Sequence, residues 1–467
     1  MTPSPDADIV AALPRDASPA RPAPVPSSAE SPSLHTVLRK PRFGFLVAGQ
    51  TVSQLGDKLH HMALIALVGA SATGNRGGLD LAALSVVFTA PVILFGPIAG
   101  ALVDRWSKRA TMIACDALRA LLVTIIPWLF AATGSLWPVY AVAFVVFLLG
   151  VFFNAAKMAL IPELVPREQL LAANAALTFV GRFATVLGIV GGGVIIGLAF
   201  WGRFGWSDFA AGFYLDGASY LVSVLTLLAI VLQGRGVADR PAAIPVPPDL
   251  VVKRGLSTIV GDVGRTLGVV WRDRTMRFTF TSLASLALFA STVYVAMTYS
   301  VQTVLGRGTK GVGYLGGTLG AGMIVGSLLV GTIGSRWDKR QTIMVGSAVI
   351  GFLMILGGVF FSFAMFVPVA FVGGALLAPV MVSQDTLLHE GAPPAARALI
   401  FSTKDLILGG AFMLSALAVG GTIYVLGRLG VDEPYRLSLS AVGLAILVTG
   451  VAGTLSLVAE KRGARSG

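Results

Sequence analysis

The sequence GALVDRWSKR at residues 100–109 returns in altered form as GTIGSRWDKR at residues 331–340. The two stretches share glycine, arginine, tryptophan, lysine and arginine at the same five positions. Each stretch follows one long apolar segment and precedes another, so each predicts a short basic turn between two helices. Because the motif recurs 231 residues later, the chain is expected to consist of two related halves.

Composition indicates that both halves lie in a membrane. Hydrophobic residues make up 55% of the chain and charged residues 12%, whereas about 25% of a soluble globular protein is charged. So few charged side chains can hardly cover the surface of a soluble protein of 467 residues. The 56 glycines favour close packing of helices in lipid.

The number of helices follows from the apolar segments. Nine segments contain no Asp, Glu, Lys or Arg, and about 20 apolar residues are enough to cross a bilayer. The segments 120–156 and 341–384 are each long enough for two helices, and residues 43–70 add one span that carries two charges. The sequence therefore predicts an all-α membrane protein with twelve transmembrane helices in two pseudo-symmetric six-helix bundles.

The distribution of Lys and Arg predicts the orientation. On the face of the N-terminus the count is 24, against six on the opposite face. By the positive-inside rule, both termini are expected in the cytoplasm of a cell whose plasma membrane the chain crosses many times. The net charge of +12 then has a topological origin, and no nucleic-acid partner is expected.

These patterns divide the chain into five parts. Residues 1–41, rich in Pro, Ala and Ser, are expected to form a disordered cytoplasmic tail. Residues 42–233 and 277–460 are the expected six-helix bundles. The segment 234–276 is interpreted as a cytoplasmic linker with an amphipathic helix at the membrane interface, or else as a solvated charged linker. Residues 461–467 form a second cytoplasmic tail.

Several kinds of site are not indicated by the sequence. The chain has one cysteine and no Cys/His cluster with the spacing of a metal site. It also lacks a phosphate-binding loop of the form GxxxxGK[ST] and any constellation of catalytic residues. We therefore expect no metal, no cofactor and no enzymatic activity.

The span count and the repeated loop resemble the major facilitator superfamily, whose loop signature is roughly G-x-L-x-D-R-x-G-R-K/R. This resemblance implies a gating role for the loop, in which Asp104 would dock on the start of helix eleven near Ser402, Thr403 and Lys404. The basic residues could instead bind anionic lipid headgroups or only fix the topology. The loop residues that the resemblance singles out are Gly100, Asp104, Arg105, Lys108, Arg109, Arg336, Asp338, Lys339 and Arg340.

Four further segments are similar to siderophore and macrolide exporters: residues 49–59, 116–122, 154–177 and 215–223. The resemblance implies a monomeric secondary transporter that exports an amphipathic small molecule, driven by protons. The third of these segments is also similar to lysophospholipid transporters, in which a lysine occupies the place of Lys157. This leaves two alternatives: a lysophospholipid flippase of the same fold, with Lys157 touching lipid or an anion, and a membrane receptor or scaffold without transport.

A polar stripe marks the first predicted helix. Gln50, Gln54, Asp57 and His61 follow at intervals of four, three and four residues, so they share one helical face. Asp57 lies roughly 20 Å into the membrane at about 1.5 Å per residue. An ionisable group at that depth indicates a functional site. We expect the stripe to face a central cavity, where Asp57 binds a proton or a cationic group of the substrate.

Two more cations belong to this hypothesis. Lys58 is turned about 100° away from Asp57 on the same helix. Arg182, in helix five, lies at a similar depth and is the expected ion-pair partner of Asp57. Protonation of Asp57 would then release Arg182 for an anionic group and couple two fluxes. Alternatively, Asp57 forms a structural pair with Lys58 or an arginine that only fixes helix packing.

Helices three and six carry other charges. Asp116 and Arg119 are three residues apart, which predicts an intrahelical pair with a structural or gating role. Asp216 is followed by Ser219 and Tyr220 at helical spacing. Because helix six is peripheral in the family that the sequence resembles, these three residues are expected to serve packing.

Overall fold

The computed structural model describes residues 34–71, 76–233, 261, 264, 268, 270–334, 337–392 and 397–466. Within these ranges the chain is helical and contains no strand, which confirms the predicted all-α class. Most of the predicted N-terminal tail and linker lie outside the described residues. The described residues 261, 264, 268 and 270–272 of the linker are helical.

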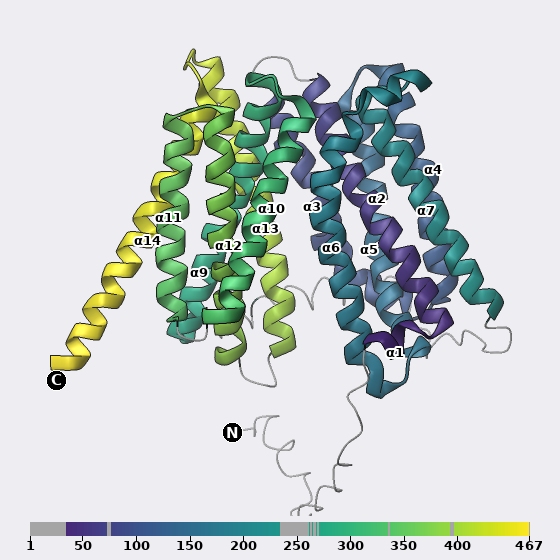
Figure 1. The fold of residues 1–467 in the computed structure, drawn as a ribbon, viewed down its shortest axis with the longest axis horizontal. Helices are drawn as coiled ribbons and strands as arrows, with labels where there is room; N and C mark the ends of the chain where they lie inside the picture. The colour runs from purple at the N-terminus through teal and green to yellow at the C-terminus, as the bar shows by residue number, and fades with distance from the viewer. Residues whose placement is uncertain are drawn as a thin grey trace, which may run out of the picture.

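The first bundle contains six long helices and three short ones. Figure 1 shows them packed side by side, with α3 and α6 nearest the second bundle in that view. The long helices are α2 (Pro41–Ser71), α3 (Arg76–Val103), α4 (Lys108–Thr133), α5 (Leu136–Leu164), α6 (Leu170–Ile196) and α7 (Asp208–Gln233). The short ones are α1 (Leu34–Leu38), η1 (Arg167–Gln169) and η2 (Ala199–Phe204).

The second bundle repeats this arrangement. Its first helix continues through two π-helical segments, and the end of its last helix lies on the same side of the molecule as the start of α2 (Figure 1). We call this side the terminal face. The elements are α9 (Arg274–Thr292), η3 (Val293–Met297), η4 (Ser300–Val304), α10 (Gly308–Ile333), α11 (Lys339–Val359), α12 (Phe363–Gly391), α13 (Arg397–Arg428) and α14 (Pro434–Ser466).

Twelve long helices are therefore present in the described part of the chain, as the sequence predicts. Eleven of them are long and apolar enough to cross a membrane. The twelfth is α2, with 31 residues. It carries the polar stripe predicted from the sequence, which lowers its mean hydropathy. The surrounding helices α6 and α7 pack along α2 and cover much of its surface.

Both predicted tails contain helical residues at their inner ends. Residues 34–38, expected to be disordered, form α1, because Val37 is fully buried against Phe43 and Leu46. At the other end, α14 continues to Ser466, so most of the predicted C-terminal tail is helical. Apolar contacts thus order the chain closer to its start than its composition predicts.

The repeated loops play the same structural part in both halves. Ser107 caps α4, with its side chain accepting a hydrogen bond from the backbone N–H of Ala110 at 3.3 Å. Asp338, at the equivalent repeat position, caps α11 and accepts from the N–H groups of Arg340 and Gln341. Capping satisfies backbone donors that the helix leaves free. The two residues differ in charge but end the turn in the same way.

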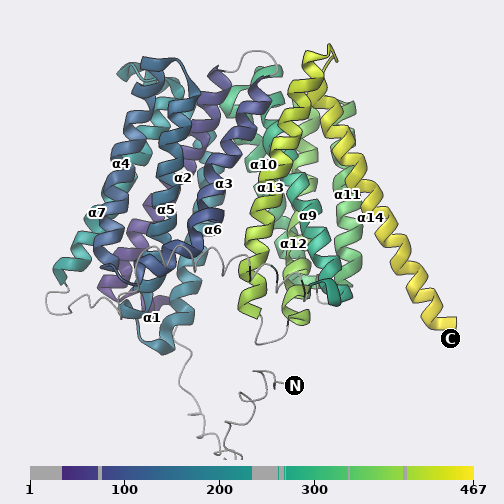
Figure 2. The same ribbon diagram turned by 180° about the vertical axis from the view of Figure 1, so that it is seen from behind.

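The two bundles touch on the side opposite the terminal face. A Cβ at Gly193 of α6 would lie only 2.6 Å from the Cα of Gly313 of α10, so only glycine permits this approach. On the other flank, Gly420 of α13 packs against the backbone of Gly78 of α3. Figure 2 shows the same two bundles from behind. The molecule is thus closed at the face away from the termini.

Candidate functional site

A buried ionic cluster lies at the centre of the first bundle. Arg119 of α4 places Nη2 2.7 Å from Oδ1 of Asp57 on α2, and Nη1 3.3 Å from Oδ1 of Asp116. The O–H of Tyr220 on α7 donates a hydrogen bond to the same oxygen of Asp57. The arginine side chain is 7% exposed, Asp116 is fully buried and Asp57 is 32% exposed. Asp57 is therefore the member of the cluster that reaches open space.

That space is a cavity of about 510 Å³ between α2, α3, α4 and α5. Gly96 and Phe88 of α3 and several apolar residues of α5 form part of its wall. Its polar lining comes from Gln50, Gln54, Asp57, Arg119, Asn154 and Lys157. Most of the predicted stripe on α2 therefore faces the cavity, together with charged groups from two other helices.

Lys157 belongs to this cavity rather than to the lipid face. Its Nζ donates a hydrogen bond to Oε1 of Gln50 at 3.2 Å. Among the described residues, no carboxylate forms an ion pair with it. The sequence predicted that Lys157 contacts a lipid or an anion. From the position of Lys157, such a ligand would have to lie inside the first bundle. An ammonium bound only to a neutral amide is available to a polar group of a ligand.

The other predicted residues of α2 occupy two different environments. Nδ1 of His61 donates a hydrogen bond to the backbone carbonyl of Asp57 at 3.3 Å, so His61 lies one turn further along the stripe. Its ring packs against Phe88 and Phe147, which line the cavity. Lys58 faces the other way, with its stem against Gly188 of α6. The predicted rotation of Lys58 away from Asp57 is thus present.

Asp57 has a partner that the sequence did not assign to it. Among the described side chains, Asp57 pairs with Arg119. The side chain of Arg182 lies outside the described residues. The sequence placed Arg119 in a self-contained pair with Asp116, and that contact exists. However, the guanidinium has further donors, and the packing of α4 against α2 and α7 brings Asp57 to one of them.

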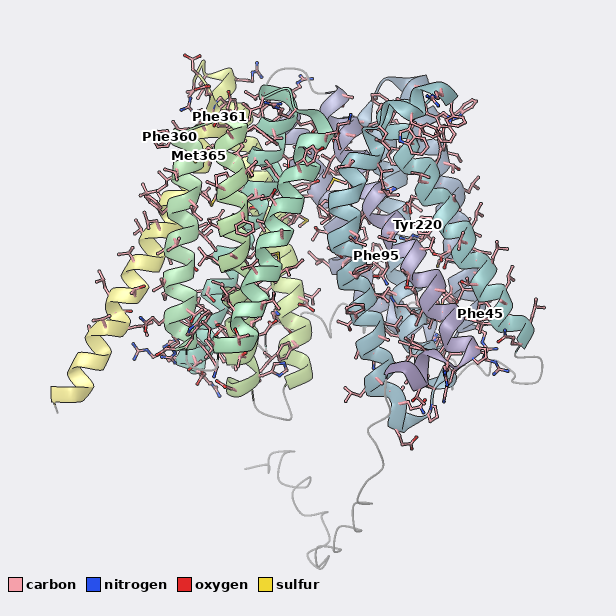
Figure 3. All side chains as sticks on the ribbon, viewed as in Figure 1. Phe45, Phe95, Tyr220, Phe360, Phe361 and Met365 are labelled. Carbon is pink, nitrogen blue, oxygen red and sulfur yellow. The ribbon has the colours of Figure 1, made fainter. Side chains whose placement is uncertain are left out.

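Two residues of the cluster were not identified from the sequence. Tyr220, assigned to packing, contacts Asp57 and also lies with its ring 4.1 Å from the Arg119 guanidinium carbon. Figure 3 shows Tyr220 in the middle of the first bundle. His60 lies beside Asp216, with Nδ1 3.4 Å from Oδ2. The spacing of three residues between Asp57 and His60 was the available signal, but only the stripe through His61 was recognised.

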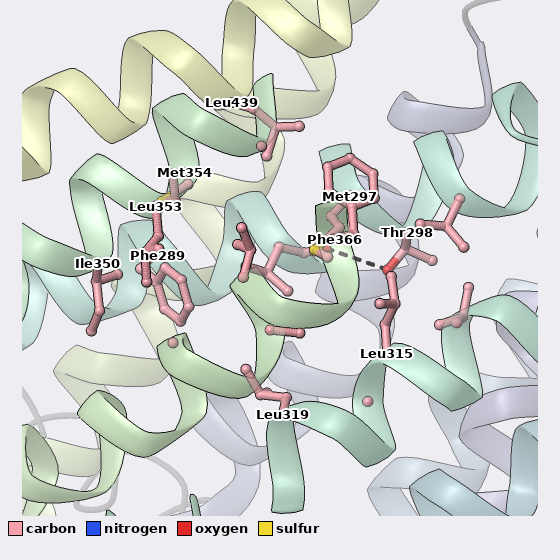
Figure 4. Close-up of a pocket in the computed structure, with 18 of the residues that line it drawn as sticks. Phe289, Met297, Thr298, Leu315, Leu319, Ile350, Leu353, Met354, Phe366 and Leu439 are labelled. Carbon is pink, nitrogen blue, oxygen red and sulfur yellow. Dashed lines mark hydrogen bonds between the residues drawn. The ribbon is translucent and has the colours of Figure 1, made fainter. Parts of the chain in front are cut away.

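The second bundle contains an apolar pocket of about 130 Å³. Figure 4 shows Phe289, Leu315, Met354 and Phe366 around it. Met62 and Ile189 of the first bundle complete its wall, so the pocket adjoins the contact between the bundles. Gly373 also lines it, and a Cβ added there would meet no atom within 4 Å. The pocket is thus suited to an apolar group about the size of an aromatic ring, as comparable cavities hold benzene.

The predicted gating residues form contacts within their own bundles. Lys108 pairs with Glu163 at the end of α5, and Lys339 pairs with Glu390 at the end of α12 at 2.6 Å. Arg109 lies 3.9 Å from Glu163. These equivalent pairs join the repeated loop to the equivalent helix in each half. Such pairs near water contribute about 0–1 kcal/mol each.

The remaining residues of the predicted gate lie in several different environments. Asp104 is exposed. Lys404, its expected docking partner, pairs with Asp385 instead. Gly100 lies in the last turn of α3, and Arg340 donates to Thr275 at 2.5 Å. Arg105 has a partner within the described residues. Arg336 lies outside the described residues.

Comparisons with known proteins agree with this architecture. The Major Facilitator Superfamily model matches residues 46–403. The putative bacilysin exporter BacE of Bacillus subtilis is 24% identical over 79% of this chain and 86% of its own length. The MFS-type transporter YfiS of Bacillus subtilis is 29% identical over 39% of this chain, and the match spans 40% of its length.

A shorter match and one solved structure add to these. Macrolide efflux protein A of Streptococcus pyogenes is 34% identical over 28% of this chain and 32% of its own length. A bacterial homologue of the human lysosomal transporter Spinster, solved inward-facing and unoccupied, superposes with a TM-score of 0.63 over 89% of this chain and 96% of its own. Its sequence identity of 15% shows a common fold alone.

The family match covers more than half of the chain and includes both repeated loops. This match agrees with the twelve long helices and with the cavity inside the first bundle. It also agrees with a relative that is named as an efflux protein. The chain is a multi-pass membrane protein. It belongs to the Major Facilitator Superfamily.

Proposed function

We propose that this transporter exports an amphipathic small molecule from the cytoplasm in exchange for protons. The observation that carries the proposal is the Asp57–Arg119 ion pair at the wall of a large cavity. A carboxylate held by a guanidinium can release it when a ligand cation binds, and a proton taken up nearby weakens the binding of that cation. The proton and the ligand then oppose each other's binding, which couples their movements.

The orientation of the cavity supports export. The 24 Lys and Arg residues on the terminal side, against six on the other, favour a cytoplasmic terminal face. Gln50 and Lys157 lie in the halves of α2 and α5 next to that face, whereas Gly193 and Gly313 close the opposite side. We interpret this arrangement as the inward-open state of an alternating-access cycle. A substrate entering from the cytoplasm would reach Asp57 directly.

The lining of the two cavities supports an amphipathic substrate. We propose that a cationic group contacts Asp57 and that a polar group contacts Lys157 or Asn154. The apolar pocket of about 130 Å³ in the second bundle would take a ring-sized apolar part. A substrate spanning both would bind the two bundles at once. A substrate that contacts both bundles binds the two conformations of the transporter with different affinity, and it can therefore shift the equilibrium between them.

One observation bears on the alternative of a lysophospholipid flippase. Lys157, the residue that suggested it, lines the cavity and binds Gln50 instead of facing lipid. The apolar pocket, at about 130 Å³, is also close in size to a cavity that holds a single benzene ring, which is less room than a long acyl chain needs. A receptor or scaffold without transport would have no use for a charged cavity at the centre of one bundle.

Uptake by inside-out membrane vesicles tests the proposal. The vesicles are given a panel of a macrolide, ethidium, a siderophore and a lysophospholipid, with and without an imposed pH gradient. We expect uptake of at least one amphipathic drug or siderophore, increased severalfold when the lumen is acidic. Uptake of the lysophospholipid alone would support the flippase. Vesicles lacking the protein are the control, and equal uptake by both would refute transport of these compounds.

A further inference from the structure

A buried pair of polar side chains in the first bundle has no part in the cavity. Nδ1 of His60 on α2 lies 3.4 Å from Oδ2 of Asp216 on α7, with side chains 2% and 0% exposed. Within the described residues, neither ring nitrogen of His60 nor this carboxylate oxygen makes a hydrogen bond. A buried polar atom without a partner costs about 1–3 kcal/mol. Two such groups facing each other therefore call for a physical explanation.

Aromatic side chains flank the histidine of this pair. The His60 ring meets Phe147 and Phe213 edge-on, with centroids 5.4 and 5.3 Å away. The other oxygen of Asp216 accepts a hydrogen bond from Ser219 at 3.2 Å. If packing were the whole role of the pair, apolar side chains would fill the site without the cost of desolvating a carboxylate. A group that gains or loses charge here gives a reason to keep both residues.

The pair is connected to Asp57 by the geometry of two helices. His60 follows Asp57 by three residues on α2, and Tyr220 follows Asp216 by four on α7. Tyr220 donates to Asp57, while His60 faces Asp216. The two helices are thus bridged twice, about one turn apart or 5.4 Å. Gly56 permits this, because a Cβ there would collide with Ser219 and Asp216.

We propose that the His60–Asp216 pair is the proton-binding site of this transporter, separate from the Asp57–Arg119 site for the substrate. The inference rests on the proposed function. With a neutral imidazole and an ionised carboxylate, the pair carries one negative charge. It takes up one proton from water, shared between Nδ1 and Oδ2, and becomes neutral overall. The same proton returns to water on the other side of the membrane.

Other charged groups around the pair explain how it would affect the substrate. On α2 these are Asp57, Lys58 and His61, and on α4 they are Asp116 and Arg119. On α7 the titratable neighbour is Tyr220, and α5 adds Lys157 beyond Phe147. Without its bound proton, the His60–Asp216 pair adds one negative charge to this group of residues. This charge favours the binding of a cation at Asp57. Proton uptake removes that charge, so the proton and a cationic substrate oppose each other's binding.

Proton release on binding tests the assignment. The purified full-length protein, in weakly buffered detergent solution with a pH indicator, is titrated with ethidium as the probe. We expect the wild-type chain to release about one proton for each ethidium bound. Asp216→Asn should bind ethidium with an affinity within threefold of the wild type and release none. His60→Gln should behave in the same way, and it serves as the second variant if Asp216→Asn does not fold.

The outcomes separate the two proposals. Asp80→Asn, which changes an acid on α3 outside the cluster, is the matched control and should release protons as the wild type does. Undiminished release by both Asp216→Asn and His60→Gln would overturn the assignment of the proton site. Failure of the wild-type chain to bind ethidium or to release any proton would instead contradict the proposed exchange itself.

Discussion

Arg119 and Asp57, 62 residues apart in the sequence, meet at 2.7 Å across two helices of one bundle. The same guanidinium also holds Asp116, so one cation lies between two carboxylates that would otherwise repel each other. Of the two, only Asp57 faces the cavity. The arrangement therefore has one fixed ion pair and one that a ligand can exchange. This asymmetry is the basis of the predictions below.

Removal of Arg119 should destabilise the first bundle. Arg119→Ala leaves two buried carboxylates without a cation, and breaking a buried pair in this way costs about 3–5 kcal/mol. Arg119→Lys keeps the charge but cannot donate to both acids in the same fork geometry. We expect a lower unfolding temperature for both variants in detergent, with the larger decrease for Arg119→Ala.

A double variant checks the cause of this loss. In Arg119→Ala/Asp116→Asn, one of the two stranded charges is gone, so part of the lost stability should return. If the double variant unfolds at the same temperature as Arg119→Ala, repulsion between the carboxylates is not the reason.

The hydroxyl of Tyr220 should matter separately from its ring. Tyr220→Phe removes the donor to Asp57 but leaves the aromatic face over Arg119. A hydrogen bond to a charged group contributes about 1.5–3 kcal/mol, so Asp57 should become more available to a competing cation. We expect tighter ethidium binding in Tyr220→Phe, measured by fluorescence titration. Tyr220→Leu also loses the cation–π contact and should be less stable than Tyr220→Phe.

Gly373 offers a steric test of the apolar pocket. Gly373→Leu places a side chain in the pocket without meeting atoms at its Cβ position, so the helix should remain intact. We expect uptake of bulky amphipathic compounds to fall at least fivefold, while small cations are less affected. Gly421→Leu is the matched control, since a Cβ at Gly421 in α13 also meets nothing within 4 Å and the residue does not line the pocket. Equal uptake of the bulky compounds by both variants would exclude a role of the pocket in substrate binding.

Sequence reasoning reached the fold more completely than the site. Periodicity and charge placed the polar stripe of α2 correctly, because every member of the stripe lies on a single helix. The partner of Asp57 lies on another helix, and spacing along the chain carries no information about how α4 is rotated against α2. The i and i+3 spacing of Asp116 and Arg119 looked complete in itself, which hid the second contact. His60 was missed for the same reason, because its partner Asp216 is on α7.

The sequence predicted only part of the role of the glycines between the bundles. Their number in the sequence indicated close helix packing, but not which helices meet. The structure shows that Gly193 and Gly313 face each other across the two bundles. It also shows Gln302 of η4 donating to the backbone carbonyl of Ile65 at 2.9 Å, a contact between bundles beside a π-helical segment. A contact of this kind depends on the relative position of two domains, which no local pattern encodes.

The contact between these glycines leads to the last prediction. Gly313→Val forces its side chain against the Gly193 backbone, so α6 and α10 cannot approach and the far face should stay open. Opening can be measured with Leu315→Cys, which is buried beside the apolar pocket. Cys115→Ser removes the single native cysteine and gives a clean background. In whole cells, a membrane-impermeant maleimide should label Leu315→Cys severalfold faster when Gly313→Val is also present.

The control for this experiment is Gly331→Val, at an exposed glycine near the end of α10 where a Cβ meets nothing. It should leave labelling at the level of the Leu315→Cys background. If Gly313→Val labels no faster than this control, the glycine contact does not close the outer side. Faster labelling together with lost uptake in inside-out vesicles would show that the bundles must come together at this face to complete a transport cycle. Transport would then depend on the contact between the backbones of α6 and α10 at Gly193 and Gly313, which have no side chains.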